Sequence, residues 1–264
     1  MMMNEALPLF LFAGTAALLL MAVFWLTSCK IRKDSIIDIG WALAIVLCSA
    51  IYCARASGFI LRKTLIFSLV LLWAGRLCLH LYKRLSRDKK EDPRYERLRK
   101  EWGTRAALNF FLLFEFQAVL AVVLSVPFLI IVFNKTPHIF PLEFLGTLIC
   151  GAGLWGEHTA DSQLKNFKSN PLNKGKVCQD GLWYYSRHPN YFFEWLIWVG
   201  YFIFALDSPY GWIGIISPLL MFYFLVYVTG VPFAEAQALI SKGEAYRRYQ
   251  ETTSFFVPWI KKKA

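Results

Sequence analysis

The chain is poor in charge, in histidine and in closely spaced cysteine. Charged residues make up 18% of its 264 residues, acidic residues (18) are outnumbered by basic ones (29), and there are only 4 histidines and 6 cysteines. No close pair of cysteines has metal-ligand spacing, so neither a zinc site nor a disulfide framework is indicated. Cys178 lies in a polar loop and is the one cysteine expected to be accessible. No internal repeat or low-complexity tract stands out.

Apolar residues, in contrast, are abundant. They make up 57% of the chain, aromatic residues alone make up 17%, and the mean hydropathy is +0.43. Such a composition is typical of membrane proteins. The first apolar run, Leu7–Leu26, is long enough to span a bilayer and is preceded by Glu5 without lysine or arginine, which favours a span over a signal peptide. Residues 1–264 are therefore expected to form a single transmembrane domain.

Apolar runs recur along the whole chain and predict an all-α bundle of seven transmembrane helices. The predicted spans are Leu7–Leu26, Ile36–Cys53, Leu65–Tyr82, Ala106–Phe133, Leu142–Glu157, Tyr191–Leu206 and Trp212–Gly230. Pro127 predicts a kink or break in the fourth span. The fifth is expected to continue past Asp161, and Pro189 is expected in the first turn of the sixth helix.

Basic residues concentrate in alternate connections. The segments after the first, third and fifth spans and the C-terminal tail hold most of the 29 basic residues. The opposite loops hold only Arg55, Arg62, Lys63 and Lys135. By the positive-inside rule the N-terminus is outside and the C-terminus cytoplasmic. This distribution explains the net charge of +11 without nucleic acid, and Lys83–Arg105 is interpreted as a juxtamembrane helix attracted to anionic lipid.

Ionisable residues inside predicted spans are candidates for function. They are Asp38, Arg76, His80, Glu115, Glu157 and Glu194. Arg76 and His80 are four residues apart and share one helix face. An acid such as Asp38 or Glu115 is a candidate partner for Arg76, and a structural ion pair is the favoured interpretation for Arg76. His80, beside Tyr82, is a candidate proton donor because its charge changes near neutral pH; an interfacial histidine bonded to backbone or water is an equal alternative.

The polar segment before the sixth span carries the strongest candidate site. Asp161, Lys165 and Lys168 share one helix face. Arg187 and His188 precede a helix N-terminus, whose free N–H groups suit an anion. Asn190 and Glu194 follow on one face of that helix. Positive-inside charge alone is the alternative interpretation, but the combination with carboxylates, amide and aromatic residues favours a site for a phosphate-bearing ligand.

The tail offers a further cluster. Glu235 follows a Gly-x-Pro break, and Tyr246 and Tyr249 are three apart on a short amphipathic helix. One interpretation is that these residues close over a cofactor, because tyrosine rings stack on flat rings. The alternative is a membrane-surface helix. Phe255, Phe256 and Trp259 are expected in the lipid interface.

Motifs along the last hundred residues carry a family resemblance. They are A-D-S-Q-L-K-N-F-K, D-G-L-W-Y-Y-S-R-H-P-N-Y-F-F-E-W, V-T-G-V-P-F-A-E and Y-R-R-Y-Q-E-T-T-S-F-F-V-P-W, with D-I-G-W and W-A-G-R-L as weaker earlier matches. The chain resembles the DUF1295-type family of bacterial membrane proteins related to steroid 5-alpha-reductases. The resemblance implies a seven-helix, NADPH-dependent reductase of a conjugated carbon–carbon double bond in a sterol-like or other lipidic enone taken from the bilayer. It also implies a bacterial inner membrane.

The resemblance also implies roles for residues. Residues 141–264 become the cofactor-binding half and 1–140 the substrate-side helices. The cofactor-binding candidates are Asp161, Lys165, Lys168, Arg187, His188, Asn190, Tyr191, Glu194, Glu235, Tyr246 and Tyr249. The position of the family's catalytic tyrosine falls on Leu81, which leaves His80 and Tyr82 as catalytic candidates.

A second resemblance gives an alternative function. R-H-P-x-Y opening a helix and the G-E-x-Y-x-x-Y tail are similar to isoprenylcysteine and phospholipid methyltransferases, which use S-adenosylmethionine. The D-x-x-x-K-x-x-K face favours NADPH, because its 2′-phosphate and pyrophosphate need cations. A non-enzymatic membrane protein is the third possibility.

Overall fold

The computed structural model describes residues 2–87 and 91–262. In these ranges every named secondary-structure element is a helix. The all-α prediction is therefore confirmed for the described chain. Residues 88–90, within the predicted juxtamembrane segment, and Lys263 lie outside the described residues. The chain forms two compact units. Unit 1 comprises Met1–Glu143 and Phe204–Ser217, and unit 2 comprises Phe144–Ile203 and Pro218–Ala264.

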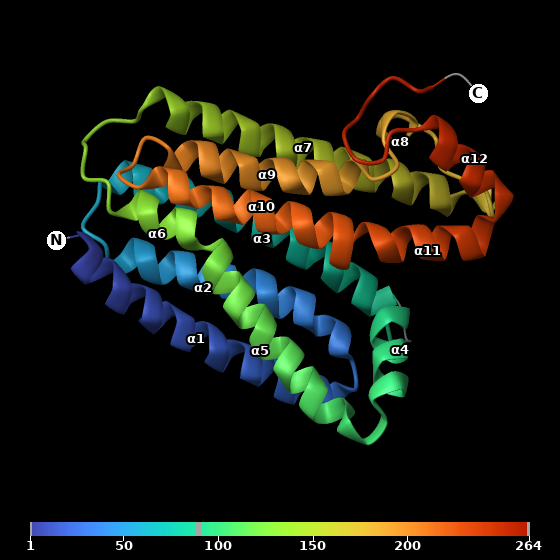
Figure 1. Ribbon diagram of the computed structural model, residues 1–264, viewed down its shortest axis with the longest axis horizontal. Coiled ribbons are helices and arrows are strands. Elements are labelled where there is room, and N and C mark those ends of the chain that lie inside the picture. Colours follow the sequence, from blue (N-terminus) through green and yellow to red (C-terminus); the bar gives the residue numbers. More distant parts are fainter. Residues whose placement is uncertain (1, 88–90, 263–264) are drawn as a thin grey trace. The chain divides into compact units, whose positions relative to one another are not determined.

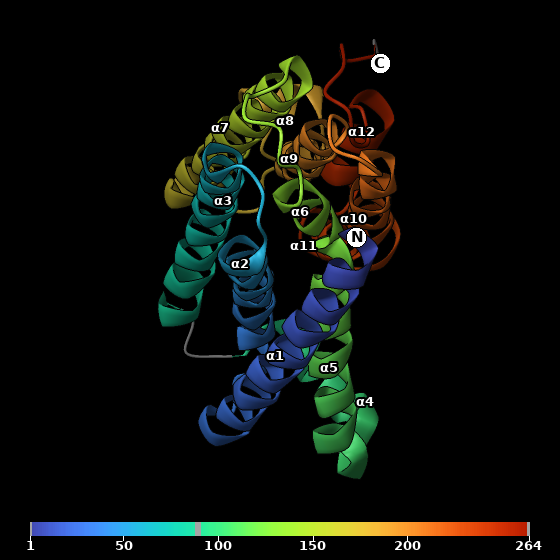
Figure 2. The ribbon, with the colours of Figure 1, turned by 90° about the vertical axis from the view of Figure 1, so that its left-hand side faces the viewer.

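Unit 1 is a packed group of long helices. Its elements are α1 (Met2–Ile31), η1 (Asp34–Ile36), α2 (Ile37–Arg55), α3 (Ile60–Arg87), α4 (Pro93–Trp102), η2 (Gly103–Arg105), α5 (Ala106–Leu124), α6 (Val126–Val132) and η4 (Gly211–Ile215). Helices α1, α2 and α5 pack on one another, and α3 packs on α2 (Figures 1 and 2). Gly40 permits the close approach of α1 to α2, because a Cβ there would lie 2.9 Å from Met21 Sδ and from the Phe24 ring.

The predicted break in the fourth span is present. Helix α5 ends at Leu124 and α6 begins at Val126, so Pro127 stands in the first turn of α6. Proline is tolerated there because its missing N–H leaves no helical hydrogen bond unmade. The buried Ser125 at the break donates to the carbonyl oxygen of Val122 at 2.7 Å.

A buried arginine holds the segment 133–140, which follows α6. Arg62 is fully buried and forms an ion pair with the equally buried Glu143. Its guanidinium also donates to the carbonyl oxygens of Asn134 (2.8 Å), Thr136 (3.0 Å) and His138 (2.6 Å). A buried charge is tolerable when it is paired and its remaining donors are satisfied. Arg62, predicted as a loop charge, is therefore a structural clamp.

Ion pairs fasten α4 to the start of α2. Asp38 accepts a hydrogen bond from Tyr95 Oη at 3.2 Å and lies 3.5 Å from Arg94. The pairing of Asp38 with Arg76 was therefore wrong: Asp38 faces α4, a helix more than fifty residues away in sequence. Asp34 is buried and pairs with Arg99, so the basic residues of this juxtamembrane helix are partly neutralised within the protein.

Unit 2 contains the C-terminal helices. All or most of each of the following elements belongs to it: α7 (Pro141–Ser169), η3 (Pro171–Asn173), α8 (Leu182–Tyr185), α9 (Pro189–Ala205), α10 (Ile216–Tyr223), η5 (Phe224–Val228), α11 (Val231–Lys242) and α12 (Glu244–Thr252). Helix α7 continues well past Asp161 and α9 begins at Pro189, both as predicted. Helices α7 and α9 lie side by side (Figure 1), with Cys150 Sγ donating to the carbonyl oxygen of Ile197 at 3.5 Å.

Five helical stretches are long and apolar enough to cross a membrane. Within the described residues they are Glu5–Ile31, Asp34–Arg55, Ile60–Ser86, Pro93–Val132 and Gly211–Lys242. This number indicates an integral membrane protein with several spans. The other two predicted spans fall in α7, whose C-terminal third is polar, and in α9, which has 17 residues.

Candidate functional site

The candidate site begins where α8 is fastened to the polar end of α7. Gly181 has a positive φ of 56°, and a Cβ there would lie 2.2 Å from Gln163 Nε2, so only glycine fits. The next residue, Leu182, donates its N–H to Gln163 Oε1 at 2.9 Å. Trp183 donates from Nε1 to the carbonyl oxygen of Ala160 at 2.9 Å. These contacts set the chain's path into α9.

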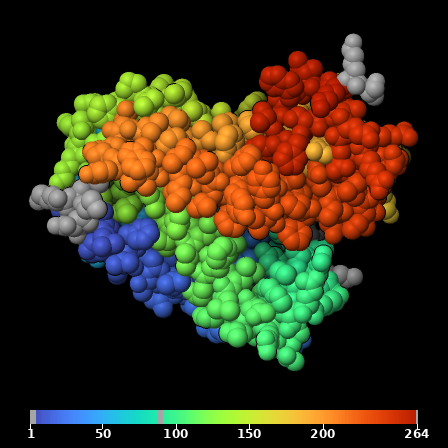
Figure 3. Space-filling view, in the orientation of Figure 1, coloured from blue at the N-terminus to red at the C-terminus, as the bar shows by residue number. Residues whose placement is uncertain are grey.

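The C-terminal segment closes over the α8–α9 junction. Arg187 donates its N–H to the carbonyl oxygen of Ser254 at 2.9 Å, and Ser186 Oγ donates to that of Phe256 at 2.7 Å. Tyr249 Oη donates to the carbonyl oxygen of Ser186 at 3.0 Å. Figure 3 shows the red C-terminal segment on the surface, next to the orange-red helix that precedes it in the sequence. Phe256, expected in the lipid interface, is instead buried among protein aromatic rings.

Glu235 is the centre of the polar cluster. Its Oε1 lies 3.1 Å from both Arg187 Nη1 and His188 Nε2 and 3.5 Å from Tyr246 Oη. Its Oε2 accepts from Gln250 Nε2 at 2.9 Å. Four residues from two segments, the α8–α9 junction and α12, thus converge on one carboxylate of α11. Within the described ranges no group of three or more histidine, cysteine, aspartate or glutamate side chains is arranged to hold a metal ion.

Aromatic rings enclose the two basic side chains. The Arg187 guanidinium lies over the Phe255 ring at 5.4 Å, and His188 stacks on Tyr191 with ring centroids 5.7 Å apart. Burial lowers the pKa of His188, and Arg187 lowers it further, although Glu235 opposes both. His188 is therefore neutral at pH 7 and, with Nε2 toward the carboxylate, donates from that nitrogen and keeps Nδ1 as an acceptor.

Two buried polar atoms beside this cluster lack a hydrogen-bond partner among the described residues. They are Nε of Arg187, a donor, and Oδ1 of Asn190, an acceptor. Arg187 lies just before α9, and Asn190 lies in its first turn. Buried polar atoms are normally paired, so each unpaired one needs an explanation. The most direct explanation is a bound ligand that accepts a hydrogen bond from Arg187 Nε and donates one to Asn190 Oδ1.

Glu194 lies one turn further into α9 and is buried. Its Oε1 accepts a hydrogen bond from Trp198 Nε1 at 3.0 Å. The fully buried Tyr201 interacts electrostatically with Glu194 and with the buried Glu157 of α7. A second polar group therefore lies between α7 and α9.

The lysines predicted to bind phosphate lie at the end of α7. Lys165 and Lys168 are exposed. Lys168 interacts electrostatically with Lys242 at the end of α11 and with Cys178. Cys178 was expected to be accessible, but it is only 5% exposed, and burial raises the pKa of its thiol. The neighbouring Val177 packs against the buried residues of α11 and α12, so the loop that carries Cys178 lies against these two helices.

The two predicted catalytic residues belong to unit 1. His80 and Tyr82 lie near the end of α3, and both side chains are exposed. Their role stays a prediction. Sequence reasoning missed Gln250 and Ser186. Gln250 follows Tyr246 by four residues on α12, so helical spacing was a usable signal for it; nothing in the sequence marked Ser186.

Comparison with known proteins places the chain in a family. Residues 24–253 match a family described as "Protein of unknown function (DUF1295)". No curated protein and no solved structure is significantly similar to the chain. The matched region spans most of the chain and includes the whole Glu235 cluster. The protein therefore belongs to the DUF1295 family.

Proposed function

We propose that the protein is a membrane-embedded, NADPH-dependent reductase of a conjugated carbon–carbon double bond in a lipidic enone, sterol-like or otherwise, that enters from the bilayer. The observation that carries this proposal is the pair of buried, unpaired polar atoms on Arg187 and Asn190. A phosphate oxygen would accept from Arg187 Nε, and a ribose hydroxyl or carboxamide would donate to Asn190 Oδ1. NADPH has all of these groups, and when bound it supplies the hydride.

The surrounding charges support a phosphate-bearing cofactor. Arg187, Lys165 and Lys168 are cations on the segments that meet at the junction, and Lys168 repels Lys242. A bound anion would relieve that repulsion. In this proposal His80 or Tyr82 supplies the proton that completes the reduction, which balances the hydride added to the other carbon.

A methyltransferase using S-adenosylmethionine is the second candidate, and one observation favours it. Glu235 is a carboxylate close to His188, which stacks on Tyr191, and to Arg187, which lies over Phe255. Carboxylates and aromatic faces both attract an ammonium or sulfonium cation. S-adenosylmethionine carries both cations and no phosphate.

The proposed membrane placement has seven spans, the N-terminus outside and the C-terminus in the cytoplasm, in a bacterial inner membrane. Basic residues in alternate connections support this orientation. The burial of Arg62 against Glu143 also supports it, because this arginine adds no free charge to the opposite loops.

Cofactor binding by the detergent-purified protein tests the proposal. NADPH, NADH and S-adenosylmethionine are compared by calorimetry, and we expect NADPH to bind. Asn190→Ala should weaken NADPH binding about tenfold, since it removes a buried hydrogen-bond acceptor. Asn166→Ala, on the exposed surface of α7, is the matched control and should bind normally. Binding by S-adenosylmethionine alone would replace the reductase with the methyltransferase, and an unaltered affinity in Asn190→Ala would refute the assigned site.

A further inference from the structure

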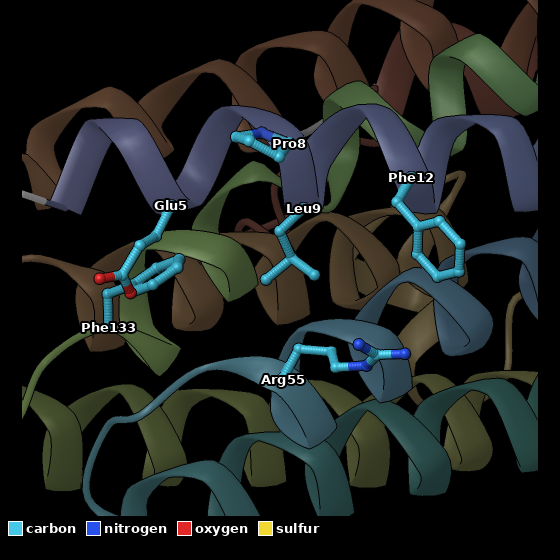
Figure 4. Close-up of a pocket in the computed structure, with 6 residues that line it drawn as sticks. All are labelled: Glu5, Pro8, Leu9, Phe12, Arg55 and Phe133. Atoms are coloured by element: carbon cyan, nitrogen blue, oxygen red, sulfur yellow. The ribbon is translucent and has the colours of Figure 1, made fainter.

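A hollow of about 390 Å³ opens in unit 1, far in sequence from the Glu235 cluster. Its wall is mostly apolar but includes one acidic and one basic side chain. The lining residues are Glu5, Pro8, Leu9, Phe12, Arg55 and Phe133. They come from the start of α1, the end of α2 and the residue after α6 (Figure 4).

The two charged side chains in the hollow are left without an ion pair in the described part of the protein. Within the described residues neither Glu5 nor Arg55 has an ion-pair partner, although both line the same hollow. Figure 4 shows Glu5 with Phe133 toward one end and Arg55 with Phe12 toward the other, with Leu9 between them. The Arg55 guanidinium lies over the Phe12 ring at 6.0 Å. The hollow therefore offers a separated positive and negative charge on an apolar floor.

The position of the hollow identifies the kind of ligand. Glu5 begins one stretch capable of spanning a membrane, and Arg55 ends the next. Both charges therefore stand where apolar chain gives way to polar surroundings, at the level of lipid headgroups. Below them Leu11 and Phe12 are exposed on α1 and suit an acyl chain.

We propose that this hollow binds a zwitterionic phospholipid. The phosphate lies against Arg55, the headgroup ammonium against Glu5, and an acyl chain along the exposed apolar face of α1. An anionic lipid would place no cation against Glu5, so charge complementarity favours the zwitterion. This site is independent of the proposed reductase.

Native mass spectrometry of the detergent-purified full chain tests this, with phosphatidylethanolamine and phosphatidylglycerol as probes. Phosphatidylethanolamine should bind more tightly. Arg55→Gln should weaken its binding about fivefold, as expected for one partly exposed ionic contact. Glu5→Lys should reverse the preference toward phosphatidylglycerol, a gain that a misfolded variant would not show.

The matched control is the double variant Arg97→Gln, Glu101→Gln, which removes one charge of each sign from the exposed surface of α4. It should keep the lipid preference of the unmodified protein. Equal affinity for the two lipids in the unmodified protein, or the same preference in Glu5→Lys, would overturn the proposal.

Discussion

At the scale of single residues, His188 is a buried base between a carboxylate and a cation. Glu235 and Arg187 are the charged groups that face it, and the rings of Tyr191 and Phe255 cover it. Burial lowers its pKa below the ordinary 6.5, so the folded chain resists a proton that the unfolded chain accepts. The free energy of unfolding should therefore fall as pH drops below about 6.5, because there the unfolded chain binds a proton that the folded chain does not.

Thermal unfolding in detergent between pH 8 and pH 5 measures this effect. His188→Gln cannot be protonated, so it should lose less stability over this range than the unmodified protein. His158→Gln, at an exposed position on α7, should behave like the unmodified protein. Parallel pH profiles for His188→Gln and the unmodified protein would contradict the buried, neutral state of His188.

At the scale of elements, the close packing of α7 and α9 depends on glycine. A Cβ at Gly200 would lie 2.6 Å from Cys150 Sγ, 2.8 Å from its backbone nitrogen and 2.9 Å from the carbonyl oxygen of Gly146. Backbone atoms cannot move aside as a side chain can, so the helices would have to separate. Small residues serve this purpose in membrane helices, where packing rather than hydrophobicity holds helices together.

Gly200→Ala should therefore lower the stability of the protein by about 1–3 kcal/mol, as overpacking does. Gly151→Ala is the matched control on α7, because a Cβ there meets nothing within 4 Å. It should leave the melting temperature unchanged or raise it, since alanine favours helix over glycine. Equal melting temperatures for the two variants would show that α7 and α9 are less tightly packed than the structure describes.

The elements that sequence predicted well are those set by local chemistry. Proline placed the break before Pro127 and the start of α9 at Pro189, because its restrictions act within one turn. The errors concern contacts between residues distant in sequence. Asp38 pairs with Arg94, and Phe256 and Cys178 are buried. A hydropathy pattern shows which face of a helix is apolar, but not which later segment covers it. For the same reason the sequence did not predict the ion pair between Arg62 and Glu143.

The same distinction applies to the candidate site: its residues could be predicted from local sequence, but the contacts between its segments could not. Sequence identified five members of the Glu235 cluster from motif and spacing: Arg187, His188, Tyr191, Glu235 and Tyr246. It did not indicate that Glu235 would be the shared acceptor, because that depends on α11 and α12 meeting the start of α9. The roles of these residues in binding a cofactor remain predictions.

At the scale of the whole molecule, the proposed orientation makes the two ends of α9 chemically distinguishable. If α9 spans the bilayer, Leu172 and Tyr210, on the connections before and after it, face opposite sides. Both are well exposed, at 78% and 52%. The connection with Leu172 carries basic residues and should be cytoplasmic, whereas the one with Tyr210 carries none.

Cysteine labelling in intact cells decides this. In a Cys29→Ser background, which removes the one exposed native cysteine, Tyr210→Cys should react with a membrane-impermeant maleimide before cells are opened. Leu172→Cys should react only afterwards. The reverse result would invert the proposed orientation and put the Glu235 cluster outside the cell, where NADPH and S-adenosylmethionine are not supplied. Labelling of both positions from outside would mean that α9 does not cross the membrane. This alternative has to be tested because α9 has 17 residues, whereas a spanning helix needs about 20.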